Sequence, residues 1–150
     1  MWPFKRKVPT LDQLPIDGPW EIRQGERDGN VVIVRSNAGY RGCGSLREYA
    51  HQVGIAVPLR SPEPTGLPSA EEAAELMGIE DTICPALEER GESVLVAIIT
   101  TTGMREFVFY TRAPGAVRQR FERLRDSIHG HEIQLMIRPD KDCAVYAQLT

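Results

Sequence analysis

The chain has 150 residues, of which 41% are hydrophobic and 26% are charged, as expected for one soluble globular domain. Its formal net charge of −3 provides no general attraction to nucleic acid or to an anionic membrane. No apolar stretch reaches membrane-spanning length. We therefore expect neither a membrane nor a nucleic-acid partner.

The three cysteines, Cys43, Cys84 and Cys143, lie far apart and follow no metal-binding spacing. An odd, unclustered set of this kind is typical of reduced thiols in the cytosol. We therefore expect a cytoplasmic protein with no intrachain disulfide, no bound metal and no cofactor.

The N-terminal part of the chain predicts a lead-in followed by strands. Residues 1–18 are proline-rich and read as an extended lead-in to a single domain over residues 19–147. Alternation from Trp20, the dipeptide Asp28-Gly29 and the apolar run that follows predict a β-hairpin. A third strand is expected near residues 51–59.

The first predicted helix begins after a proline-rich connection. Ser69 is expected to cap it, with Glu72 at the position of a capping-box carboxylate. Gly78 and Pro85 interrupt its apolar stripe, so we expect a bent or two-part helix that ends near Gly91.

A second hairpin is predicted from Val94 to Tyr110, with its turn at Thr102-Gly103. Both faces of its first strand are apolar. Because an exposed apolar edge promotes aggregation, we expect the N-terminal hairpin, or failing that a second copy of the chain, to cover this strand.

The second predicted helix begins at Pro114 and exits at Gly130. One apolar stripe runs along it, formed by Val117, Phe121, Leu124 and Ile128. Residues 133–137 then alternate like a strand with one buried face. His129 and His131 flank Gly130, and two histidines are too few for a zinc site, so we expect them to be solvated.

These elements give the order strand, helix, strand, strand, helix, strand. That is the order of a ferredoxin-like α+β sandwich (βαββαβ), here with an additional N-terminal β-hairpin. We expect both helices to pack on the same face of the sheet.

Four residues are candidates for a binding site. Glu80 and Asp81 are adjacent carboxylates near the predicted helix interruption, where they could hold a cation, receive arginines or act as acid and base. The alternative is that Asp81 caps the second part of the helix. Arg105 and Tyr110 lie on one predicted strand, where Arg105 is either a site cation or a solvated edge charge. No phosphate loop, dinucleotide fingerprint or nucleophile elbow occurs, so no catalytic residue is assigned.

A longer set of residues carries a resemblance to a known family. In order, it comprises Trp20, Arg35 with Asn37, Gly66-Leu67-Pro68, Glu80-Asp81, Thr101-x-Gly103-x-Arg105-Glu106, Tyr110, Asp140 and Tyr146. Over about residues 18–147 this pattern resembles the bacterial family called domain of unknown function 695. Cys143 departs from the pattern, because the family usually has a tryptophan there. The family is similar in fold to the regulator of ribonuclease activity B, a ferredoxin-like protein that acts by binding a ribonuclease.

We therefore expect a non-enzymatic protein-interaction or regulatory module with a protein partner. The alternative is a small enzyme or small-ligand binder whose surface site contains Glu80, Asp81, Arg105 and Tyr110. Convergence of those four side chains on one concave pocket would favour the alternative.

Overall fold

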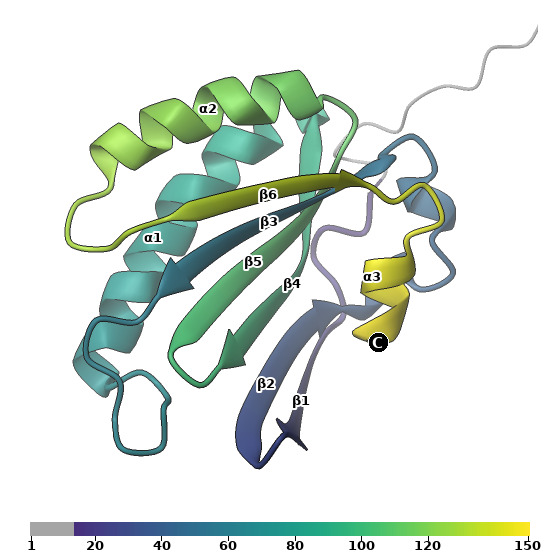
Figure 1. Cartoon of the computed structure of the whole chain (residues 1–150). Helices are drawn as coiled ribbons and strands as arrows, with labels where there is room; N and C mark the ends of the chain where they lie inside the picture. Colours follow the sequence, from purple (N-terminus) through teal and green to yellow (C-terminus); the bar gives the residue numbers. More distant parts are fainter. Residues whose placement is uncertain (1–13) are drawn as a thin grey trace, which may run out of the picture.

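An open six-stranded antiparallel sheet forms the centre of the structure, a computed structural model that describes residues 14–150 (Figure 1). Its strands lie in the order β1-β2-β4-β5-β3-β6. Their bounds are Trp20–Arg27 for β1, Asn30–Asn37 for β2, His51–Pro58 for β3, Ser93–Thr101 for β4, Met104–Thr111 for β5 and Gln134–Pro139 for β6. Most of the lead-in predicted over residues 1–18 falls outside the described residues.

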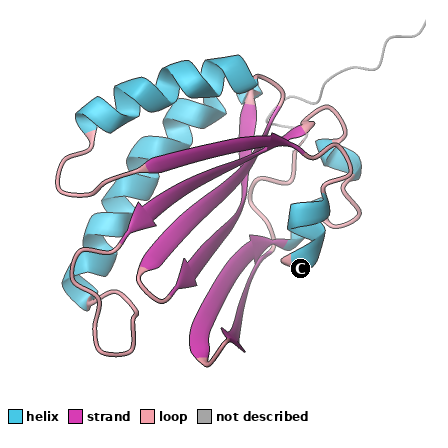
Figure 2. Ribbon diagram, viewed as in Figure 1, coloured by secondary structure: helices cyan, strands magenta, loops and turns pink. Residues whose placement is uncertain are grey.

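The fold is α+β, because helices combine with an antiparallel sheet, and helices lie on both faces of that sheet (Figure 2). The two longer helices, α1 (Ala70–Glu88) and α2 (Pro114–Ser127), cover one face, as predicted (Figure 1). The short helix α3 (Ala144–Gln148) packs on the opposite face. Within residues 14–150, no helix is both long and apolar enough to cross a membrane.

The main core lies between the sheet and the two longer helices. Alternate side chains of β3 and β5 point into it because successive residues of a strand face opposite sides. The predicted stripe of α2 supplies Val117, Phe121 and Leu124, which are buried, whereas Ile128 follows the end of the helix and is half-buried.

A second core lies on the opposite face, under α3 and the short helical turns between β2 and β3. Its largest side chains are four buried tyrosines, Tyr40, Tyr49, Tyr110 and Tyr146. The sheet is therefore covered on both faces near β4, which explains why that strand is apolar on both sides.

The N-terminal hairpin covers the edge of β4, as predicted. Residues Ile33 to Ser36 of β2 pair antiparallel with Thr100 to Ala97 of β4. β2 therefore covers the edge of β4, and a second copy of the chain is not needed for this. Gly103 has a φ of +81° at the predicted turn between β4 and β5, a conformation that favours glycine.

The prediction for α1 is partly correct. The hydroxyl of Ser69 accepts a hydrogen bond of 3.1 Å from the Glu72 backbone N–H, as an N-cap does. However, α1 continues through Gly78 and Pro85, so a two-part helix is wrong and Asp81 caps nothing. Burial of the apolar stripe against the sheet outweighs the backbone hydrogen bond that Pro85 removes.

Two further expectations, that His131 is solvated and that no intrachain disulfide forms, are wrong because the partner residues lie far away in the sequence. His129 is exposed, as predicted, but His131 is buried and its Nε2 lies 2.7 Å from the carboxylate of Glu72 in α1. Cys43 and Cys143 form an intrachain disulfide across a separation of 100 residues. Both cysteines lie in segments that the sheet brings to one end. The cysteines therefore no longer indicate a reducing compartment.

Candidate functional site

The four predicted site residues divide between the two faces of the sheet. Glu80 and Asp81 are neighbours in the middle of α1, whereas Arg105 and Tyr110 lie on β5. Phe107 points into the core under α1 and α2, so Arg105, two residues earlier, faces the same side. Tyr110 belongs to the core under α3.

A small hollow opens where β2, β4 and β5 pass α1, and we call it the Arg105 hollow. Its volume is about 120 Å³. Its polar side chains are Arg35, Glu80, Thr100 and Arg105, and its apolar side chains are Ile22, Ile33 and Ile98. The structure therefore brings two of the four predicted residues together, Glu80 and Arg105, and leaves Asp81 and Tyr110 out.

Glu80 is held by an arginine from the N-terminal hairpin. An Nη of Arg35 donates to both carboxylate oxygens of Glu80, at 2.9 and 3.1 Å. The guanidinium carbon of Arg35 also lies 5.7 Å from the centre of the Trp20 ring, within the range of a cation–π contact. Glu80 thus joins α1 to β2 and partly neutralises the hollow.

Arg105 is the least neutralised group in the hollow. Its Nε donates a hydrogen bond of 3.1 Å to the hydroxyl of Thr100. Its two Nη groups have no acceptor among the residues that the structure describes. Burial lowers the pKa of Arg105, the nearby Arg35 lowers it further, and Glu80 partly opposes both effects.

Asp81 is exposed on the same helix, one position beyond Glu80. The pKa of the nearby Cys84 thiol is raised by burial and by the charges of Glu88, Glu80 and Asp81, whereas the charge of Arg35 lowers it. Burial is the main reason that the pKa of Cys84 is raised, so this thiol is held protonated.

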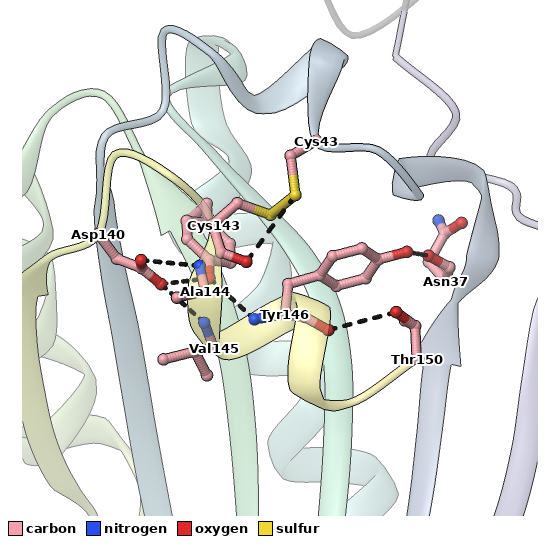
Figure 3. Close-up of a disulfide and its surroundings, with 9 residues drawn as sticks. Asn37, Cys43, Asp140, Cys143, Ala144, Val145, Tyr146 and Thr150 are labelled. Carbon is pink, nitrogen blue, oxygen red and sulfur yellow. Dashed lines mark hydrogen bonds between the residues drawn. A yellow bond between two sulfur atoms is a disulfide. The ribbon is translucent and has the colours of Figure 1, made fainter.

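Tyr110 has a structural partner on the other face. Its hydroxyl donates a hydrogen bond of 2.7 Å to Asp140 and accepts one from the backbone N–H of Tyr146. Asp140 also accepts from the N–H groups of Ala144 and Val145, which begin α3 (Figure 3). Burial alone would raise the pKa of Asp140, but these hydrogen bonds lower it. Tyr110 and Asp140 therefore anchor α3.

The disulfide lies beside this anchor. Cys143 immediately precedes α3 and bonds to Cys43, while the hydroxyl of Tyr146 donates to the backbone carbonyl of Asn37 (Figure 3). Covalent and hydrogen-bonded contacts thus hold α3 against the sheet from both sides.

The hollow contains two guanidinium groups and one carboxylate, so its charge favours an anion. Planar guanidinium groups bind carboxylates and phosphates through pairs of parallel hydrogen bonds. No three His, Cys, Asp or Glu side chains within residues 14–150 gather as a metal site would require.

Sequence reasoning missed Arg35 and Thr100. Thr100 could have been found, because a two-residue turn at Thr102-Gly103 places residue 100 opposite residue 105. Arg35 belongs to the family pattern, but its position beside Glu80 could not be predicted, because it depends on the pairing of β2 with β4, which are separated by 55 residues or more along the chain.

The match to a family model covers residues 19–150, which is most of the chain. The chain belongs to DUF695, a family of unknown function. No curated protein and no solved structure matches it. Three residues of the pattern named above, Arg35, Glu80 and Arg105, line the hollow, and Arg35 bonds to Glu80 there.

Proposed function

We propose that this DUF695 protein is a non-enzymatic protein-interaction module that binds a carboxylate of a partner protein in the Arg105 hollow. The observation that carries the proposal is the guanidinium of Arg105, which is half-buried beside a second arginine and offers its Nη groups to no acceptor in the described chain. A bound carboxylate would accept these hydrogen bonds and relieve the repulsion between the two cations.

The size of the hollow favours a side chain of a protein over a whole metabolite. Pockets for small molecules usually measure about 300–1,000 Å³. A volume of about 120 Å³ holds little more than one carboxylate group. Ile22, 72% exposed at the rim, offers apolar surface to the residues that flank that carboxylate.

The enzyme alternative finds less support. Two of its four residues are absent from the hollow, since Tyr110 anchors α3 and Asp81 faces solvent. Glu80 is engaged by Arg35 and holds α1 to the hairpin, which makes it a poor general base.

We infer also that the fold is the ferredoxin-like sandwich with an added N-terminal hairpin. The order β4-β5-β3-β6, with α1 and α2 on one face, supports this inference, because these are the four strands and two helices of the βαββαβ unit.

A selection of random peptides displayed on phage, with the full chain as bait, tests the proposed function. We expect enriched peptides with Asp or Glu next to an apolar residue. Arg105→Ala should weaken their binding about tenfold or more, the cost of a charge-assisted hydrogen bond. Glu80→Gln should tighten binding, because it frees Arg35 and removes a competing carboxylate.

Arg123→Ala, on the exposed side of α2, is the matched control and should leave binding unchanged. Thermal unfolding of each variant separates loss of binding from loss of fold. Arg105→Lys should recover only part of the affinity, because lysine keeps the charge without the planar fork. The proposal would be overturned if none of the enriched acidic peptides bound folded Arg105→Ala more weakly than the wild type.

A further inference from the structure

A second groove runs between α2 and β6, and we call it the α2–β6 groove. Its volume is about 420 Å³, larger than that of the Arg105 hollow. Helix α2 lines it with Arg118, Phe121, Glu122 and Arg125, and the chain entering β6 lines it with Glu132, Ile133, Gln134 and Leu135. Figure 1 shows α2 running alongside β6, which is the outermost strand at that edge of the sheet.

One wall of this groove is an unpaired strand edge. Among residues 14–150, β6 is the last strand of the sheet and pairs only with β3. The backbone N–H of Asp140 donates to the carbonyl of Ala50, at 2.8 Å. This bond shows which backbone N–H groups of β6 point toward β3 and which point away from it. Because alternate residues of an antiparallel ladder point in opposite directions, the N–H groups of Leu135 and Ile137 point to the free edge.

The edge of β6 lacks the protection that the other edge of the sheet has. β1, the outer strand at the opposite side, contains four charged residues, Glu21, Arg23, Glu26 and Arg27. Such charges discourage another strand from pairing. β6 contains one, Arg138, and its exposed Met136 is apolar. Only Pro139, at the end of β6 and without an N–H, limits pairing there.

Near each end of the groove lies a charged side chain without an ion-pair partner in the described chain, although Glu132 accepts a hydrogen bond of 3.4 Å from Nε2 of Gln134. Arg125 pairs with Glu122, but Arg118 and Glu132 form no ion pair within the described chain. Glu132 lies in the connection that leads from the end of α2 at Ser127 to the start of β6 at Gln134, so it lies toward the Arg125 end of α2. Arg118 precedes Arg125 by seven residues, about 10 Å along a helix.

We propose that the α2–β6 groove binds an extended peptide segment of a partner protein, which adds to the sheet as a strand beside β6. The peptide carries an acidic residue against Arg118 and a basic residue against Glu132. Strand addition uses backbone hydrogen bonds for affinity and side-chain contacts for specificity. This surface is separate from the Arg105 hollow, so the inference stands independently of the proposed function.

A second copy of the chain fits this groove less well. Two β6 strands paired across a two-fold axis would bring two α2 helices close together. α2 carries four arginines against two acidic residues, so the helices would repel each other.

The test uses peptides from the same phage selection whose binding survives Arg105→Ala. One such peptide is synthesised with each backbone nitrogen methylated in turn. Methylation should weaken binding about tenfold or more at every second residue of the peptide. The N–H groups of those residues face β6, where a methyl group removes the hydrogen bond and blocks close approach of the strands. Methylation of the intervening residues should have little effect. Amide hydrogen exchange should slow at Leu135 and Ile137 and stay unchanged at Met136, which already faces β3.

Arg118→Glu should weaken binding of the peptide, and a peptide with its acidic residue changed to lysine should recover it. Arg123→Glu, outside the groove on the same helix, is the matched control and should have no effect. Three results would overturn the proposal. The selection yields no peptide that survives Arg105→Ala, methylation shows no alternation, or the slowed exchange at Leu135 and Ile137 arises from dimer formation without peptide.

Discussion

The carboxylate of Glu72 lies 2.7 Å from Nε2 of His131, a residue 59 positions later in the chain. The same carboxylate accepts hydrogen bonds from the backbone N–H groups of Arg60 and Ser61, at 2.6 and 3.1 Å. One buried side chain at the start of α1 therefore fixes both the connection before α1 and the connection that leads to β6.

This contact makes stability depend on pH. Burial by itself would raise the pKa of Glu72, but its hydrogen bonds outweigh burial and lower the pKa. A carboxylate with a lowered folded-state pKa stabilises the fold above the unfolded value, about 4.3, and that stabilisation is lost as the pH falls through the folded value. Unfolding by urea at a series of pH values should show this acid-side loss.

Glu72→Gln should reduce the loss on the acid side and lower stability at neutral pH by about 1–3 kcal/mol, because the amide replaces an ionised acceptor. Glu71→Gln, an exposed neighbour in the same turn, is the control. An unchanged pH profile in Glu72→Gln would contradict the assignment.

The disulfide should account for a large share of the stability. Cys43 and Cys143 close a loop of 100 residues, for which the chain-entropy account gives about 4–5 kcal/mol. The double variant Cys43→Ser/Cys143→Ser should lose about that free energy of unfolding, and reductant should lower the stability of the wild type alone. Cys84→Ser is the control, because Cys84 is free.

Alkylation of the denatured protein without reductant should modify one cysteine, and with reductant all three. Modification of three cysteines without reductant, in protein purified under air, would show that the bond does not form.

The N-terminal hairpin should be necessary for solubility. Deletion of residues 1–36 removes all of β1 and all of β2 except Asn37, and it leaves the Ala97–Thr100 edge of β4 unpaired beside apolar side chains. We expect the product to aggregate, whereas deletion of residues 1–10 should be harmless. Size-exclusion chromatography with light scattering measures both. A soluble, folded monomer from the longer deletion would refute this expectation.

The stripe of α2 should show the cost of core cavities. Phe121→Ala and Leu124→Ala each remove a buried side chain from the main core, so each should lower the free energy of unfolding by about 2–5 kcal/mol. Arg123→Ala, on the exposed side of the helix, should change it by less than about 0.5 kcal/mol. Equal effects at buried and exposed positions would contradict the packing described.

Local patterns determined much of the fold. Alternation in β3 and β6, the Thr102-Gly103 turn, the Ser69 cap and the stripe of α2 each depend on neighbours within a few residues, so the sequence displays them directly. The apolar faces of β4 also predicted that the hairpin would cover that strand, because an uncovered edge of this kind is unfavourable in water.

Only the tertiary structure decided which distant groups meet. Glu80 and Arg105 were chosen from the sequence, but Arg35 reaches them through the pairing of β2 with β4. Tyr110 instead hydrogen-bonds to Asp140 on the other face of the sheet. The Glu72–His131 contact and the Cys43–Cys143 bond likewise join segments separated by 59 and 100 residues. Such contacts depend on register and on the twist of the whole sheet, which no local spacing encodes.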